Sequence, residues 1–291
     1  MNTAGKVSNT LEDFWKTASG KSLNTGRPLV MGIINLTPDS FYENSRAEVG
    51  DDFIHRVGKM LEDGMDILDI GAVSTRPGSE DPGLQAEMDR LLPALSLLRK
   101  CFPELCISVD TFRADVAGEA LRIGVSAIND ISAGGDDDQM LKVIAGHNVP
   151  YIMMHKQGMP AQMQEKPHYD DVLLDISEFF RLKIEKFNAF GIKKIILDPG
   201  FGFGKTLEHN YQLLAGLSHF KSFGYPILAG ISRKSMLYRL LDITPEEAMN
   251  ASSVANTLAL YGGADILRVH DVKQAREVVE IFSMYKRFLH D

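Results

Sequence analysis

The chain has 291 residues, of which 44% are hydrophobic and 24% charged, and no apolar run approaches the roughly 20 residues that cross a bilayer. Its formal net charge of −8 argues against nucleic acid as a partner. The N-terminal stretch lacks the apolar core of a signal peptide, so we expect a cytoplasmic protein with no membrane partner. The length suits one α/β barrel, which we place at 28–291 behind a polar extension over 1–27.

Eight apolar runs of strand length end abruptly at polar residues, and helical patterns separate the runs. In chain order the runs end at Asn35; Ser74, Thr75 and Arg76; Asp110; Asn129 and Asp130; His155; Asp198; Ser232, Arg233 and Lys234; and Arg268 and His270. Continuous apolar strands that alternate with helices are typical of a parallel sheet, and eight such units close a barrel. The sequence therefore predicts a (β/α)8 TIM barrel whose catalytic groups project from the carboxyl ends of the strands.

Between these runs, apolar stripes at helical spacing predict core-facing helices. The clearest lie at 53–61, 84–98, 172–187 and 272–285. A capping box with proline at the first helical position, 244–247, predicts the start of the helix before the eighth strand.

Long polar loops and a group of cations gather at one rim of the predicted barrel. The loops 36–50, 72–83 and 156–170 each follow a strand, as lids and substrate clamps do. The cations at strand ends are Arg76, Arg233, Lys234, Arg268 and His270. An acidic chain that gathers cations on one rim is expected to hold an anion there.

The densest motif is ILDPGFGFGKTLEHN, residues 196–210. Pro199 keeps Asp198 extended, which aims its carboxylate into the barrel mouth. The three glycines of the motif allow a tight turn before a helix that begins near Thr206, and their spacing fits neither a Walker A loop nor a dinucleotide fingerprint. We predict a functional role for Asp198, because a carboxylate that ends an apolar strand otherwise needs a buried partner.

Cysteine and histidine patterns favour no transition-metal site. Cys101 and Cys106 match no common zinc or redox spacing, so we expect buried, reduced thiols. No HExxH motif or His/Cys cluster occurs, and His209, in the helix-starting EHN, is interpreted as structural.

Eight motifs, in order and spread over the whole barrel, closely resemble those of the dihydropteroate synthase family. They are MGIINLTPDSF (31–41), STRPGSE (74–80), SVDTF (108–112), AINDISAG (127–134), MMHKQGMP (153–160), DPGFGFGKTLEHN (198–210), GISRKSM (230–236) and ILRVHDV (266–272). The resemblance implies a transferase of folate biosynthesis, a target of sulfonamides. Such an enzyme joins 6-hydroxymethyl-7,8-dihydropterin pyrophosphate to p-aminobenzoate and releases pyrophosphate. It also implies a homodimer packed through the C-terminal helices.

The resemblance carries site roles onto matching positions. Those implied for the pterin are Asp110, Asn129, Met154, Asp198, Lys234 and Arg268. Those implied for pyrophosphate are Asn35, Arg76, Arg268 and His270, with Asn35 also a ligand of Mg²⁺. Those implied for p-aminobenzoate are Phe41, Thr75, Pro77, Phe203, Ser232 and Lys234. The residues expected to act in catalysis are Asp110, Asp198, Lys234, Arg268 and His270.

The reaction that the resemblance implies needs no activated nucleophile. Pyrophosphate would leave first, and the negative Asp110 would help the electron-rich pterin to stabilise the methylene cation. The arylamine, already free near neutral pH, would then attack. Stabilisation of the departing polyanion should dominate catalysis.

The loops depart from the family pattern, and two alternatives stay open. SFYENSR (40–46) stands where the family commonly has SFSDGGR, and Gly71-Ala72-Val73 stands where Gly-Gly-Glu is usual. One alternative is a catalytically silent paralogue that binds pterin. The other is a pterin-dependent methyltransferase, in which the pyrophosphate residues would have no purpose.

Overall fold

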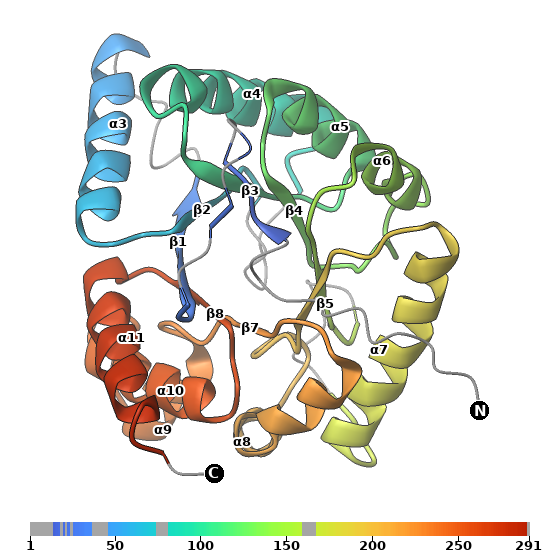
Figure 1. The fold of residues 1–291 in the computed structure, drawn as a ribbon, viewed down its shortest axis with the longest axis vertical. Helices are drawn as coiled ribbons and strands as arrows, with labels where there is room; N and C mark the ends of the chain where they lie inside the picture. Colours follow the sequence, from blue (N-terminus) through green and yellow to red (C-terminus); the bar gives the residue numbers. More distant parts are fainter. Residues whose placement is uncertain are drawn as a thin grey trace.

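The computed structural model of the chain is a parallel barrel surrounded by helices (Figure 1). It describes residues 14–17, 20, 22–23, 26–36, 46–73, 81–158 and 167–289. The strands are β1 (Leu29–Asn35), β2 (Ile67–Gly71), β3 (Cys106–Asp110), β4 (Ala127–Asp130), β5 (Tyr151–Met154), β6 (Ile195–Asp198), β7 (Leu228–Ala229) and β8 (Ile266–Val269). Their order is β6-β5-β4-β3-β2-β1-β8-β7, and a parallel bridge from Leu197 to Ile227 joins the two edges. The expected (β/α)8 barrel is confirmed.

Helices connect successive strands on the outside of the ring. They are α3 (Arg46–Glu62), α4 (Leu84–Cys101), α5 (Ala114–Ile123), α6 (Met140–His147), α7 (Val172–Ala189), α8 (Leu207–Ala215), the 3₁₀ helix η1 (Leu217–Phe223), α9 (Ser235–Leu241), α10 (Met249–Tyr261) and α11 (Val272–Lys286). The first long loop is therefore shorter than the expected 36–50, because α3 already begins at Arg46.

The helix before the eighth strand begins later than predicted. Thr244 N–H does reach the Glu247 carboxylate at 2.9 Å, as a capping box requires. The backbone bonds that follow join residues three apart, from Glu247 to Thr244 and from Ala248 to Pro245. These bonds close a tight turn rather than an α-helical one, so the helix itself starts at Met249.

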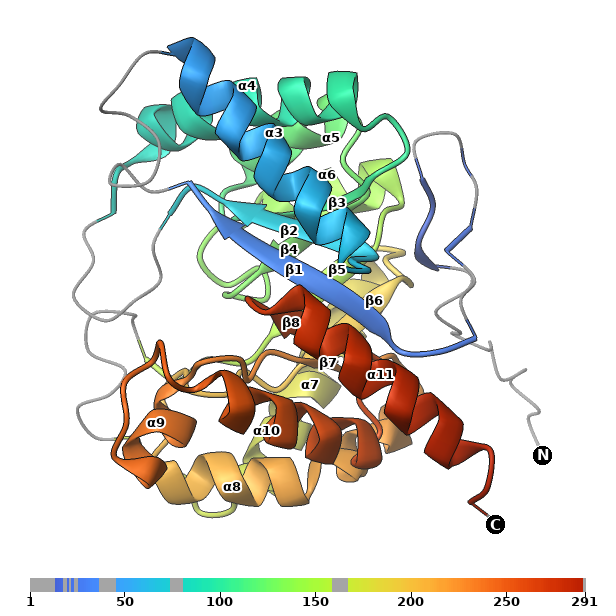
Figure 2. The ribbon, with the colours of Figure 1, turned by 90° about the vertical axis from the view of Figure 1, so that its left-hand side faces the viewer.

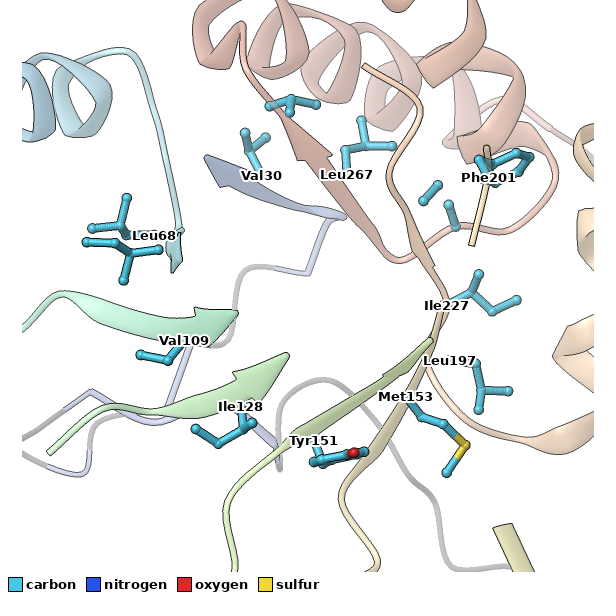
Figure 3. Close-up of a cluster of buried hydrophobic side chains, with 14 of the residues drawn as sticks. Val30, Leu68, Val109, Ile128, Tyr151, Met153, Leu197, Phe201, Ile227 and Leu267 are labelled. Carbon is cyan, nitrogen blue, oxygen red and sulfur yellow. The ribbon is translucent and has the colours of Figure 1, made fainter. Parts of the chain in front are cut away.

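Alternate strand residues pack outward against the helices. This core includes Val30, Leu68, Val109, Ile128 and Leu267, all buried (Figure 3). Strand side chains alternate between two faces, so the residues between these point into the barrel.

A separate apolar cluster fills the barrel interior at the end where the strands begin. Its members are Leu29, Met31, Ile67, Cys106, Ala127, Ile152, Ile196, Leu228, Ile266, Phe14 and Trp15. Trp15 is fully buried, and Figure 2 shows the described N-terminal residues at the side from which β1 starts. The aromatic pair therefore closes the floor of the barrel, and the polar strand ends lie at the opposite end.

Cys106 is buried and free, and its burial raises the pKa of the thiol to about 11. The expectation of a buried thiol was wrong for Cys101, which is exposed as the last residue of α4. Among the described residues, no helix is both long and apolar enough to cross a membrane.

Candidate active site

The inward-facing positions change from apolar to polar two residues beyond the floor cluster. Stepping by two from Ile67, Ala127, Ile196 and Ile266 leads to Asp69, Asn129, Asp198 and Arg268. On β3 the same step from Cys106 leads to Ser108, and a second step leads to Asp110. The strands are in parallel register, with Gly71 opposite Asp110 and Asp110 opposite Asn129. Parallel strands end at the same rim, so these side chains share one barrel mouth.

Arg268 is the centre of a partly buried hydrogen-bond network in this mouth. Its Nε donates to Asp69 Oδ2 at 2.6 Å, and its Nη2 donates to Asp110 Oδ2 at 2.8 Å. Asn129 Nδ2 donates to the same Asp69 oxygen at 3.0 Å. Asp69 is fully buried, and its second oxygen has no hydrogen-bond partner among the described residues. One carboxylate thus orients both a cation and an amide of the mouth.

Asp69 is a site residue that the sequence analysis missed. It lies inside the apolar run of β2 rather than at its end, and only the run ends were considered. The strand alternation would have identified it, because Asp69 shares its inward face with Ile67 and Gly71.

Burial and charge shift the pKa values of the Arg268 network. Burial raises the pKa of Asp110 to about 7, although the Arg268 guanidinium works against this rise. Burial lowers the pKa of Arg268, but the carboxylates of Asp69 and Asp110 outweigh that effect and raise it above its ordinary value. Arg268 is therefore a permanent cation, while Asp110 changes charge near neutral pH.

A second group of side chains surrounds Asp198. The carboxylate accepts a hydrogen bond from Gly200 N–H at 2.8 Å, and burial raises its pKa against the opposing effect of Lys234. Lys234 Nζ donates to the carbonyl of Phe201 and lies 4.7 Å from the centroid of the Phe203 ring. Burial lowers the pKa of Lys234 to about 8 against the carboxylate of Asp198. The structure thus gathers the predicted Asp198, Lys234 and Phe203.

Gly230 lies close to both groups and carries no side chain. It follows β7 on the inward-facing side, and a Cβ built on it would lie 3.9 Å from both Arg268 Cβ and Lys234 Nζ. Met154 pairs with Asp198 across β5 and β6 and is buried. A flat ligand between Arg268 and Lys234 would therefore meet no side chain from β7.

The remaining described residues of the predicted site lie at the rim. Ser232 is buried, and its Oγ lies 3.2 Å from Nδ1 of the exposed His270. Asn35 is exposed at the end of β1, opposite Gly71 in register. His209 has the structural role expected of it, since it forms a capping box with Thr206 at the start of α8.

The predicted cation group divides in the structure. Arg233 donates to both oxygens of Asp271, at 2.9 and 2.6 Å, and thereby ties the loop after β7 to the start of α11. Its backbone lies at a φ of 54°. This guanidinium forms an ion pair with a carboxylate, so Arg268 and Lys234 are the Lys and Arg side chains of the predicted group that face the mouth within the described residues.

Four predicted site residues, Phe41, Thr75, Arg76 and Pro77, lie outside the described residues. Within the described ranges, no group of three or more His, Cys, Asp or Glu side chains could hold a metal ion.

Comparison with known proteins identifies the family of the chain. The family model for pterin binding enzymes matches residues 31–270. Dihydropteroate synthase from Escherichia coli (strain K12) is 40% identical over 266 residues, which cover 91% of this chain and 94% of that protein.

Solved structures agree with the sequence comparison. The Yersinia pestis dihydropteroate synthase in a sulfonamide drug complex superimposes with a TM-score of 0.87 at 42% identity, covering 94% of this chain and all of that one. The Xanthomonas albilineans enzyme with 4-aminobenzoic acid has a TM-score of 0.86 at 35% identity, covering 94% of this chain and 99% of that one. The chain therefore belongs to the dihydropteroate synthases, the pterin-binding transferases of folate biosynthesis.

Proposed function

We propose that the mouth around Arg268 binds dihydropterin-methyl pyrophosphate and joins its methylene carbon to the amine of p-aminobenzoate. The observation that supports this most strongly is the inward-facing set Asp110, Asn129, Asp198 and Arg268, which lies beside Gly230, a residue without a side chain. A pterin is a flat array of donors and acceptors, and these side chains offer donors and acceptors that complement it.

The pterin is held by carboxylates and amides from neighbouring strands. Asp198 accepts the hydrogens of the pterin amino group and the adjacent ring N–H, and Asn129 supplies both a donor and an acceptor to the opposite edge. Lys234 donates to the ring carbonyl or nitrogen, with Met154 as an apolar wall. Burial of Asp198 strengthens these hydrogen bonds, because the surrounding dielectric is low.

The departing pyrophosphate is stabilised at the lip of the mouth. Arg268 donates two of its five N–H groups to Asp69 and Asp110. The other N–H groups can donate to phosphate oxygens, and the guanidinium plane can stack on the pterin. His270 and Asn35 complete the shell. Mg²⁺ would be held by the Asn35 amide oxygen and the substrate phosphates, and it would neutralise the charge of the leaving group.

Asp110 acts through its charge. In the ionised form it lies beside the position where the methylene carbon becomes positive as pyrophosphate departs. A pKa of about 7 means that this carboxylate is largely ionised only above neutral pH. No base is required for the arylamine, which attacks as a free nucleophile.

The second substrate, p-aminobenzoate, lies on the outer side of the pterin. Phe203 covers its ring, and Ser232 and Lys234 contact its carboxylate. Phe41, Thr75 and Pro77 belong to this subsite by their match to the family motifs. The resemblance to the X. albilineans enzyme with 4-aminobenzoic acid supports this assignment.

The homodimer implied by the family is supported by an apolar surface on the last helices. Exposed large hydrophobic residues gather on α9, α10 and α11, and they are Leu240, Leu241, Met249, Val254, Leu258, Tyr261, Ile281, Met284 and Tyr285. Exposed apolar residues on neighbouring helices are typical of association sites when they form a patch. A dimer would place it at the interface.

A coupled pyrophosphate-release assay with both substrates tests the proposal. Wild-type protein should release one pyrophosphate per dihydropteroate formed. Arg268→Ala and His270→Ala should each lower turnover about 100-fold or more. Lys193→Ala, an exposed lysine at the opposite end of the barrel, serves as the control. Unchanged turnover in both site variants would rule out the assigned roles.

A further inference from the structure

Lys205 is a buried lysine whose nitrogen is surrounded by three acceptors. Its side chain is 3% exposed. Its Nζ lies 2.7 Å from the Gly200 carbonyl, 3.2 Å from the Phe203 carbonyl and 3.1 Å from Nδ1 of His155. An ammonium group has three donors and no acceptor, so each of its hydrogens has one partner here.

This geometry determines the state of His155. Burial lowers the pKa of Lys205 to about 7, although the Asp198 carboxylate works against this fall. In its protonated form Lys205 only donates, so Nδ1 of His155 is then the acceptor and the proton of the neutral ring is on Nε2. Burial and the neighbouring Lys205 cation lower the pKa of His155 to about 2, so the ring stays neutral. His155 also packs edge-on against Phe179, with ring centroids 4.9 Å apart.

Lys205 is one of several side chains that hold the turn at 200–204. Tyr169 Oη donates to the Gly204 carbonyl at 3.0 Å and Gly202 N–H donates to Asn210 Oδ1 at 2.7 Å, whereas Lys205 donates to the carbonyls of Gly200 and Phe203. Gly200 and Gly204 have positive φ, and a Cβ on either would overlap a carbonyl oxygen of the segment after β5, that of His155 or Gln157. The turn therefore lies directly on another backbone. It needs ties from side chains that come from outside the turn.

The turn at 200–204 is connected at both ends to residues that we assign to the substrates. The Gly200 peptide donates through its N–H to Asp198 and accepts through its oxygen from Lys205. The Phe203 carbonyl accepts from Lys205, while its ring faces Lys234. A shift of this turn would move the Phe203 ring more than Asp198, which is anchored in β6.

We propose that Lys205, supported by the acceptor nitrogen of His155, is a positioning residue that sets the p-aminobenzoate wall at Phe203. The inference rests on the assignment of Phe203 to p-aminobenzoate. It adds Lys205 and His155 to the residues that shape the site. Neither would touch a substrate, and both would act through the carbonyls of one glycine-rich turn.

Steady-state kinetics on three variants test the proposal. Lys205→Met, which keeps the length of the side chain without the donors, should raise KM for p-aminobenzoate about 10- to 100-fold. Its effect on KM for the pterin pyrophosphate should be several-fold smaller. His155→Asn places an amide oxygen near the position of Nδ1 and should stay near wild type, whereas His155→Leu should resemble Lys205→Met. Lys194→Met is the control, since Lys194 also donates to a backbone carbonyl but at the floor of the barrel.

The possible failures of this test are separable. Phe203→Ala with an unchanged KM for p-aminobenzoate would overturn the substrate assignment itself. A normal KM in Lys205→Met, alongside an affected Phe203→Ala, would overturn the positioning role alone. If His155→Asn and His155→Leu raise KM for p-aminobenzoate equally, His155 acts only through packing and not as an acceptor for Lys205. If Lys205→Met does not fold, the ¹⁵N shifts of His155 in the wild-type protein decide, recorded at a pH below the lowered pKa of Lys205, where the lysine is protonated. An unprotonated Nδ1 supports the proposal, and a protonated one refutes it.

Discussion

Removal of the Asp69 carboxylate should damage both stability and pterin binding. Asp69→Ala leaves the guanidinium of Arg268 without its 2.6 Å partner and Asn129 without its 3.0 Å acceptor, in a site where Asp69 is fully buried. Breaking a buried ion pair costs about 3–5 kcal/mol, which corresponds to a fall in Tm of roughly 5–15 °C in a chain of this size. A misplaced Arg268 should also lower kcat/KM for the pterin pyrophosphate about 100-fold.

A charge-neutral variant separates geometry from charge. Asp69→Asn keeps an oxygen for both donors but loses the charge assistance, which is worth about 1 kcal/mol, so kcat/KM should fall only about 5- to 10-fold. Asp66→Ala is the control, because Asp66 accepts from two nitrogens of Arg27 at the barrel floor, both at 2.8 Å. It should lower Tm without changing kcat/KM. If Asp69→Ala behaves like this control, Asp69 does not position Arg268 for the substrate.

Three further outcomes follow from the geometry. Burial raises the pKa of Asp110 to about 7, so kcat/KM should fall as pH decreases through 7, and Asp110→Asn should lose this acidic limb; a limb that persists in the variant would assign it to another group. Trp15→Ala should cost about 3–5 kcal/mol in chemical denaturation yet leave kcat/KM at 10 °C unchanged, unless the floor cluster shapes the mouth. Gly200→Ala should abolish turnover because its Cβ would overlap a backbone carbonyl, whereas Gly224→Ala, at a similar φ of 73° with no atom within 4 Å, should cost only about 1 kcal/mol in stability and serves as the control.

Much of the fold was predictable because the barrel repeats one simple pattern. Each strand is buried on both faces, so it reads as an apolar run, and each run ends where the chain reaches the rim. β7 is the exception, with two residues where the sequence suggested a longer strand. Pro226 has no N–H to offer a neighbouring strand, and the Ile227 N–H is taken by the Asp265 carboxylate at 2.8 Å.

The sequence predicted those residues of the candidate site that lie at strand ends, and it missed those that lie deeper in a strand. Asp110, Asn129, Asp198 and Arg268 stand at or near strand ends, and they do converge. Asp69 is missed by such a reading because it lies one residue pair deeper in the barrel.

Lys205 and His155 illustrate a different limit. They are 50 residues apart and meet only because two neighbouring strands lead their following loops to the same place. No local pattern reports that contact. The commitment of Arg233 to Asp271, across 38 residues, was hidden for the same reason.

A crystal structure of the protein with a bound pterin tests the central claim most directly. The account predicts a pterin ring in the barrel mouth, within hydrogen-bond distance of both Asp198 and Asn129, with the Arg268 guanidinium still held by Asp69. A pterin bound elsewhere, or one in the mouth that contacts neither Asp198 nor Asn129, would contradict it.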